Sequence, residues 1–292
     1  MKQLRCRICQ AETLPAGQVF GSYTKRWYAL RHCPTCHFSF VAEPWTEYAA
    51  IYSEDYYRGK GADPYVDYVY EIEQREQTVR FYEWRGIIEH VRALVGAAPN
   101  RRWLDFGCGN GGLMAYGRTH TNYQIDGFEE GWIREYANQA GIPILTPAEL
   151  SAREGTYDVV TAIEVLEHIV DPLAALRQIR RLLKPGGIFF YTTGNAQPFR
   201  DRLASWRYVI PEIHVSFYEP ATLARALTLA GFQPFTISEL PGWQDIIRYK
   251  ILKGLGIHTR SRFEQLLPWK LLTSLADRRL AISAHPAARA IV

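Results

Sequence analysis

The chain has 292 residues, of which 47% are hydrophobic and 22% charged, and its formal net charge is +4. This length is enough for one large domain or two unequal ones, and the composition excludes a chain that is disordered throughout. The net charge is too small to indicate a nucleic-acid partner, and without an apolar signal core or a membrane-length apolar run we expect a cytoplasmic protein.

Residues 1–44 contain four of the five cysteines, arranged as two CxxC pairs. Cys6 and Cys9 form the first pair, and Cys33 and Cys36 form the second, with 23 residues between them. A CxxC turn directs two thiolates at one cation, and a second such turn completes a tetrahedral zinc site. A redox pair is the alternative, but it is expected at a strand-to-helix junction. The spacing therefore predicts a zinc ribbon with structural Zn²⁺ bound by these four cysteines.

Residues 45–100 are aromatic and polar, and their second half keeps a helical period. Apolar side chains recur at helical spacing from Glu73 to Val95, so that Tyr82, Ile87 and Val91 can share one face. This stretch is predicted to be a helix that follows an aromatic linker.

From about residue 101 to residue 240, short apolar runs alternate with amphipathic stretches. The apolar runs, which we predict as strands, are 103–106, 124–129, 144–145, 157–163 and 187–193. The amphipathic stretches, which we predict as helices, are 111–119, 131–140, 171–183 and 219–230. Strands that alternate with helices of this length indicate crossover connections. The predicted fold class is therefore α/β, with a doubly wound, Rossmann-like, mostly parallel sheet.

The first apolar run leads into a glycine-rich turn that contains Gly107 and Gly109. Glycines let the backbone approach a ligand closely, and the following helix offers free N–H donors, but such a loop alone is shared by dinucleotide and nucleoside binders. Two acids are more informative. Asp105 precedes the loop, where it would repel a pyrophosphate and attract an ammonium, and Glu129 ends the next run, where a carboxylate can accept ribose hydroxyls.

A cofactor with an amino-acid group at one end and a ribose further along fits these two acids, and S-adenosylmethionine is such a molecule. The chain resembles the class I S-adenosylmethionine-dependent methyltransferases over about residues 101–240. The resemblance rests on four motifs in the family's order, which are LDFGCGNGG, GFEEGW, YDVVTAIEVLEHIVDP and LLKPGGIFFYTT. It implies a methyltransferase core that binds this cofactor.

The resemblance also implies roles for the matching residues of the first half of the core. Asp105, Gly107 and Gly109 would hold the methionine end of the cofactor, and Glu129 would hold the ribose. Cys108 lies inside the same loop, where a small residue allowing close packing is a better interpretation than a nucleophile, because methyl transfer needs no nucleophile from the protein.

Further positions follow from the same resemblance. Glu130 and the region of Thr146 would border the adenine, and Ile163 and Glu164 would close over the cofactor beneath the sulfonium. They complete the predicted cofactor site on the side of the second and fourth strands.

The tyrosine-rich stretch 48–70 occupies the place where such enzymes carry a lid over cofactor and acceptor. Tyr56 or Tyr57 could contact the methionine carboxylate, and Tyr65 or Tyr68 the acceptor. Aromatic packing between the ribbon and the core is the alternative, because tyrosine is commonly half-buried.

Two histidines are candidates for a base that removes a proton from the acceptor. His168 lies in the motif LEHIVDP, where the family's histidine is often structural. His214 follows the fifth predicted strand, in a segment that resembles the EHxSYF stretch of zinc-ribbon sugar C-methyltransferases, whose histidine is the proposed base. This chain departs from that pattern by carrying Ile213 in place of glutamate.

Residues 241–292 form a basic extension with nine Lys or Arg against three Asp or Glu, and its apolar periodicity predicts helices. The extension could be a phosphate-binding or membrane-surface patch, or only a solvated face.

Together these features predict a methyltransferase that acts on a small-molecule acceptor, at a hydroxyl or activated carbon of a sugar or natural product. An RNA methyltransferase whose zinc ribbon recognises the substrate is the alternative, and the low net charge and the absence of an Arg/Lys cluster near the ribbon argue against it.

Overall fold

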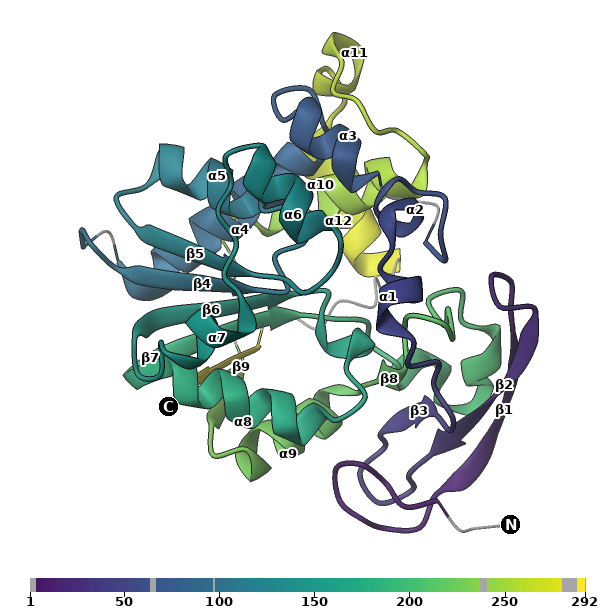
Figure 1. Cartoon of the computed structure of the whole chain (residues 1–292). Helices are drawn as coiled ribbons and strands as arrows, with labels where there is room; N and C mark the ends of the chain where they lie inside the picture. The colour runs from purple at the N-terminus through teal and green to yellow at the C-terminus, as the bar shows by residue number, and fades with distance from the viewer. Residues whose placement is uncertain (1–3, 64–66, 97, 237–240, 280–287, 292) are drawn as a thin grey trace.

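The computed structural model describes residues 4–63, 67–96, 98–236, 241–279 and 288–291, which form two β-sheets surrounded by helices (Figure 1). The larger sheet has the strand order β5-β4-β6-β7-β10-β9, and the smaller has the order β1-β2-β3-β8. The strands are β1 (Leu14–Gly21), β2 (Arg26–His32), β3 (Ser39–Val41), β4 (Arg102–Phe106), β5 (Gln124–Phe128), β6 (Tyr157–Ile163), β7 (Leu183–Thr192), β8 (Ser216–Phe217), β9 (Gln233–Thr236) and β10 (Ala288–Ile291). The helices are α1 (Tyr48–Ile51), α2 (Glu54–Tyr57), α3 (Tyr68–Glu73), α4 (Arg80–Val95), α5 (Gly112–His120), α6 (Ile133–Gln139), α7 (Pro147–Ser151), α8 (Pro172–Leu182), α9 (Pro220–Leu229), α10 (Trp243–Gly254), α11 (Arg262–Gln265) and α12 (Trp269–Arg279), with two 3₁₀ segments, η1 (Leu166–His168) and η2 (Gln197–Ser205).

The predicted α/β class is confirmed, because the neighbouring strands β5, β4, β6 and β7 of the larger sheet pair in parallel. Their side chains are mostly buried on both faces, as parallel strands covered by helices require. Helices α4, α5 and α10 lie over one face of the sheet, and α8 and α9 lie over the other (Figure 1). The run predicted at residues 144–145 forms only an isolated parallel bridge between Leu145 and Phe128.

The helix predicted from Glu73 to Val95 begins only at Arg80, because a tertiary contact interrupts its first part. Residues of the C-terminal extension lie alongside the chain just before α4. Thr78 forms an isolated antiparallel β-bridge with Thr259, and the Val79 N–H donates to the His258 carbonyl at 3.0 Å. The Val79 N–H and the Gln77 carbonyl therefore bond to the distant segment, whereas the Gln77 and Thr78 N–H groups still donate to the Gln74 carbonyl.

The cysteine-bearing segment forms the hairpin β1–β2 and the short strand β3, and a strand from the core completes its sheet. Ser39 pairs with Phe217 and Phe40 with Ser216, so β8 extends the sheet beyond β3. This sheet is therefore built from residues that lie far apart in the sequence.

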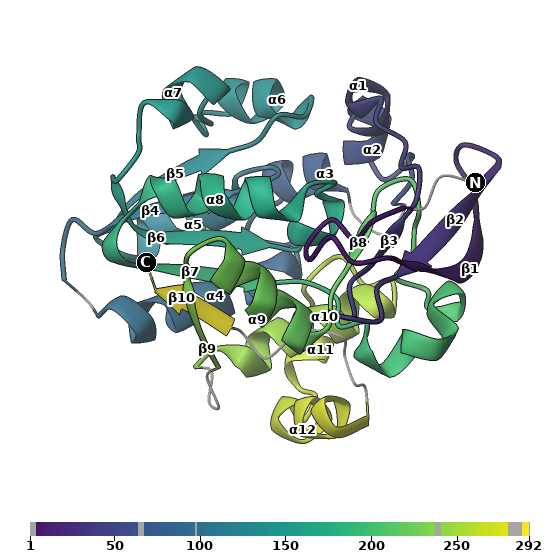
Figure 2. The same cartoon turned by 90° about the horizontal axis from the view of Figure 1, so that it is seen from below.

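The C-terminal extension packs against the core through α10 and β10. Helix α10 crosses α4 where Gly86 faces Gly242, and the Arg85 guanidinium donates to both carboxylate oxygens of Asp245 at 2.7 Å. The strand β10, which the periodicity of the extension does not predict, runs antiparallel between β7 and β9 (Figure 2).

Within the part of the chain that the structure describes, no helix combines the length and the hydrophobicity needed to cross a bilayer.

The contact between α4 and α10 gives a first prediction. A Cβ atom added at Gly86 would lie 2.5 Å from the carbonyl oxygen of Gly242, whereas one added at Gly254 would meet nothing within 4 Å. Gly86→Ala should therefore lower the free energy of unfolding by about 1–3 kcal/mol, because overpacking outweighs the gain in helix propensity. The matched change Gly254→Ala should raise it, by up to about 1 kcal/mol. Urea titration of both variants measures the difference, and equal stabilities would contradict the close helix contact.

Candidate functional site

A cavity of about 1470 Å³ opens at the carboxyl ends of the parallel strands. Its lining includes Asp105 from the end of β4, Glu129 just beyond β5 and Glu164 just beyond β6. The aromatic segment α1–α2 and the helix α10 also contribute to the lining. Ligands of open α/β sheets bind outside the carboxyl ends of the strands, so this cavity is the candidate site.

The glycine loop forms one wall of the cavity in a conformation that requires glycine. Gly107 and Gly109 have φ values of +73° and +52°, in the left-handed region that side chains rarely adopt. A Cβ atom at Gly107 would also lie 2.6 Å from the side chain of Val165. The loop therefore leads directly into α5 with its backbone close to the cavity.

Glu129 holds this loop through backbone hydrogen bonds. Its carboxylate accepts N–H groups from Gly109 at 3.0 Å, from Glu130 at 3.0 Å and from Gly131 at 3.3 Å. A carboxylate has about four acceptor positions, so one remains for a further donor such as a hydroxyl. Burial raises the pKa of Glu129, and the three backbone donors oppose that shift.

Asp105 is buried at the base of the loop, and its environment leaves its charge uncompensated. The Thr161 hydroxyl donates to Asp105 at 2.7 Å, and Thr161 in turn accepts the Trp103 indole N–H at 2.9 Å. Burial raises the pKa of Asp105 to about 7, although the Thr161 hydrogen bond lowers it. A cation bound above this carboxylate would be favoured.

The remaining predicted cofactor residues divide between the cavity and the surface. Glu130, Ile163, Glu164 and the buried Cys108 line the cavity, and burial keeps the pKa of the Cys108 thiol well above its usual value. Thr146 is not among the described lining residues; its hydroxyl accepts the Glu149 N–H at 3.2 Å and caps α7. The Thr146 hydroxyl is thus used at the start of the helix, and the adenine contact expected in this region stays a prediction.

The tyrosines of α1–α3 form one packed aromatic wall. Tyr57 is buried with its ring against Tyr68 and Trp132, and Tyr56 packs edge-on against Tyr57. These rings also line the cavity, so packing and ligand contact are compatible. Tyr65 lies outside the described residues.

His168 and His214 come together at the far end of the cavity, with ring centroids 4.8 Å apart. His214 Nδ1 lies against the Tyr208 carbonyl, which can only accept a hydrogen bond, so Nδ1 carries the proton and Nε2 carries the lone pair. His168 Nδ1 is 3.1 Å from the Tyr52 hydroxyl. Burial lowers the pKa of both rings, so both are neutral at neutral pH.

Two glutamates lie beside these histidines, the half-buried Glu164 and the buried Glu167. Burial would raise the pKa of Glu164, but the Lys250 ammonium 3.1 Å away lowers it to about 2. Burial and the nearby charge of Glu164 raise the pKa of Glu167 to about 8. The Tyr208 hydroxyl contacts Glu167, and the Thr193 hydroxyl donates to it at 2.7 Å. The pair therefore holds one negative charge at neutral pH, which Lys250 balances.

Glu167, His168 and His214 also offer one ligand atom each within 4.8 Å of one another. Two imidazoles and a carboxylate suit a divalent cation as well as proton transfer. The geometry is thus compatible with either chemistry.

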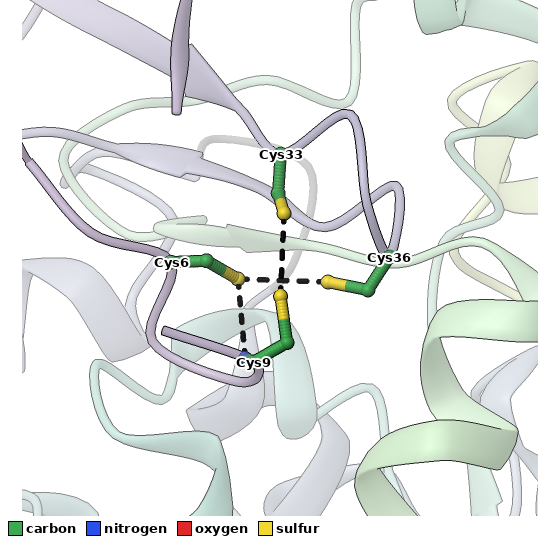
Figure 3. A group of neighbouring side chains, drawn as sticks. All are labelled: Cys6, Cys9, Cys33 and Cys36. Carbon is green, nitrogen blue, oxygen red and sulfur yellow. Dashed lines mark hydrogen bonds between the residues drawn. The ribbon is translucent and has the colours of Figure 1, made fainter. Parts of the chain in front are cut away.

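The four cysteines of the CxxC pairs form a second cluster, away from the cavity (Figure 3). Their sulfur atoms lie within 4.8 Å of one another, with 3.5 Å between Cys6 and Cys36 and 3.4 Å between Cys9 and Cys33. All four are free thiols. Four sulfur atoms bound to one tetrahedral zinc ion, with Zn–S bonds of about 2.3 Å, have S···S distances similar to these. The four thiols therefore fit this metal.

Sequence reasoning missed several lining residues. Glu167 is adjacent to the predicted His168, and Lys250 and Lys253 are three residues apart on a predicted helix. Only the first had a usable signal, its place in the LEHIVDP motif. Tyr208 has no distinguishing sequence pattern, and Tyr52 belongs to the tyrosine-rich stretch but its contact with His168 is set by tertiary structure.

Residues 77–237 match the family model described as a methyltransferase domain. The ubiquinone biosynthesis O-methyltransferase of Bordetella avium is 30% identical over 165 residues, which are 50% of this chain and 68% of that enzyme. That of Bordetella pertussis is 31% identical over 162 residues, 49% of this chain and 67% of that enzyme.

A similar fold occurs in phosphoethanolamine N-methyltransferase 2 of Haemonchus contortus, solved with phosphomonomethylethanolamine and S-adenosylhomocysteine. The TM-score is 0.52 at 15% identity, and the match covers 85% of this chain and 61% of that one. A structure of the same Haemonchus enzyme with S-adenosyl-L-methionine gives a TM-score of 0.50. The chain therefore belongs to the methyltransferase-domain family and is an S-adenosylmethionine-dependent methyltransferase.

Proposed function

We propose that this protein methylates a hydroxyl group of a small molecule and that His214 accepts the hydroxyl proton. The observation that carries the proposal is the His214 ring, whose Nδ1 is held by the Tyr208 carbonyl while the ring lines the same cavity as the glycine loop. The Bordetella relatives are named O-methyltransferases, which supports a hydroxyl acceptor over a carbon or nitrogen.

The residues at the carboxyl ends of β4 and β5 fit the cofactor. Asp105 would attract its ammonium group, and Glu129 has an acceptor position for a ribose hydroxyl. The backbone of Gly107 and Gly109 would approach the methionine end, with Tyr57 closing over it. When bound, S-adenosylmethionine supplies an electrophilic methyl group on a sulfonium.

In the proposed reaction the protein orients the acceptor and holds its proton. His214 is a neutral base, because burial lowers its pKa and the Tyr208 carbonyl fixes its tautomer. Glu164, ionised beside Lys250, keeps a negative charge at this end of the cavity. A fixed base within reach of the acceptor typically contributes 10²–10⁴-fold in rate.

We also propose that Cys6, Cys9, Cys33 and Cys36 bind structural Zn²⁺. The support is the set of four free thiols within 4.8 Å of one another on two CxxC turns. Four thiolate ligands leave no open position, so this zinc would not contact the reacting groups.

Cofactor affinity should depend on Asp105 and on pH. Asp105→Asn should weaken binding of S-adenosylmethionine by at least about tenfold, because it removes the charge that faces the ammonium. In the wild type, affinity should rise with pH through about 7, since Asp105 must lose its proton to attract a cation. Isothermal titration calorimetry at pH 6 and pH 8 measures both effects. Glu135→Gln is the matched control, because Glu135 is an exposed acid of α6 that does not line the cavity, and a pH dependence that persists in Asp105→Asn would contradict the assignment.

Turnover should depend on His214. Release of S-adenosylhomocysteine can be screened with phenols, sugars bearing free hydroxyls, carbon acids and a short RNA as acceptors. With an active hydroxyl acceptor, His214→Gln should lower kcat by about 10²-fold or more and leave cofactor affinity within about threefold. In the wild type, kcat plotted against pH should fall on the acid side only below the usual histidine pKa of about 6.5, because burial lowers the pKa of His214.

Three results of that screen would contradict this proposal. The first is full activity in His214→Gln, and the second is methylation of RNA alone. The third is a rate that requires added Mg²⁺ or Mn²⁺, which would assign Glu167, His168 and His214 to a cation.

Metal content tests the cysteine cluster separately. Protein prepared without chelator should contain about one zinc per chain by plasma mass spectrometry, and Cys33→Ser should contain clearly less. Cys108→Ser is the control, because Cys108 lies in the glycine loop and should leave the zinc content unchanged. An unchanged zinc content in Cys33→Ser would contradict the assignment of four thiolate ligands.

A further inference from the structure

We propose that the cysteine-bearing sheet positions His214 and that Glu212 is the positioning residue that couples the two. The proposal rests on the proposed role of His214 as the base. In this proposal the N-terminal segment has a role in the reaction, although it lies away from the glycine loop.

Glu212 is the first connection, because its carboxylate holds the turn of the β1–β2 hairpin. Oε1 accepts the Tyr23 N–H at 3.0 Å and the Thr24 N–H at 3.2 Å, and the side chain is only 1% exposed. The approach requires a glycine in the hairpin, since a Cβ atom at Gly21 would lie 2.4 Å from Glu212 Oε1. Only one residue separates Glu212 from His214 along the chain, so the turn fixes the segment that carries the base.

The second connection is a continuous set of backbone pairs from β3 to both histidines. The Val41 N–H donates to the Val215 carbonyl at 3.0 Å, and the Val215 N–H donates to the Glu167 carbonyl at 2.8 Å. Val215 therefore joins β3 to the η1 segment that carries His168. The hydroxyls of Ser216 and Tyr218 donate to the carbonyls of Ile169 at 2.6 Å and Leu166 at 2.9 Å, which ties β8 to the same segment.

The third connection links this strand to the cysteines. The Cys36 carbonyl accepts the Thr222 hydroxyl at 2.6 Å, and the Cys33 N–H donates to the Phe38 carbonyl at 2.8 Å. The Phe38 ring packs against Tyr218 with centroids 5.3 Å apart. The second CxxC turn is thus attached to the chain that directly follows β8, and a metal bound there would stiffen the strand that follows His214.

These contacts make a specific demand on His214. Its ring must keep Nδ1 on the Tyr208 carbonyl, and the backbone that sets the ring position is bounded by Glu212 on one side and Val215 on the other. Loss of the Glu212 or the Val215 contacts should let the ring adopt a mixture of tautomers. Asp105 and Glu129 should stay in place, because they belong to other strands.

The test compares Glu212→Ala with Glu212→Gln in the full-length zinc-loaded protein. The readouts are the ¹⁵N chemical shifts of the His214 ring, kcat with the acceptor found by the screen, and the Kd for S-adenosylmethionine. Glu212→Ala should convert a single Nδ1–H tautomer into a mixture and lower kcat about tenfold or more, with Kd changed less than twofold. Glu212→Gln should restore the single tautomer and most of the rate, because its amide oxygen can accept the same N–H groups.

A matched control is Glu43→Ala, since Glu43 is an exposed acid of the same segment and should leave all three readouts unchanged. If Glu212→Ala does not fold, Glu212→Asp serves instead, because it keeps the charge and retracts the carboxylate by one methylene. Wild-type ¹⁵N shifts and rate in the folded Ala or Asp variant would overturn the proposal. The ring shifts require no turnover, so they remain readable if His214→Gln shows that the base lies elsewhere, and the two failures stay distinguishable.

Discussion

The parallel register of β4 with β5 and β6 is the constraint on which the site depends. Asp105 pairs opposite Gly127 on one side and Thr161 on the other, so the strand ends reach the same edge of the sheet together. Acids that lie far apart in sequence therefore meet around one cavity, and the absence of a side chain at Gly127 lets Met114 and Cys108 of the glycine-loop region pack against β5. Burial at this edge raises the pKa of Asp105 and Glu129, and the site is thereby prepared for a cationic ligand.

Two segments outside the parallel core support the end of the cavity that holds Glu164 and His214. The extension supplies Lys250, which keeps Glu164 ionised, and the cysteine-bearing sheet borders the segment that carries His214. Glu164 itself has φ of +54°, a conformation that a non-glycine residue adopts only where its surroundings hold it. Its N–H donates to the Thr192 carbonyl at 3.0 Å, so β7 fixes the strained residue while Lys250 fixes its charge.

The sequence predicted what local pattern determines. Alternating apolar runs predicted the parallel strands, and the positions of the acids relative to the glycine loop indicated Asp105 and Glu129, which both line the cavity. Features set by distant contacts were not predictable. The break before α4 depends on His258, the fourth strand of the small sheet is two residues long, and the pairing of Lys250 with Glu164 joins positions 86 residues apart.

The place of β10 has a consequence for how the chain is made. Residues 288–291 lie between β7 and β9, although β7 ends at Thr192 and β9 at Thr236. A ribosome synthesises β7 and β9 well before the strand that joins them, and the two cannot pair directly in the final order. Until β10 arrives, both present unpaired backbone edges, which are templates for association with other chains. Before β10 is made, the nascent protein therefore exposes one edge of β7 and the strand β9 to chaperones and to aggregation.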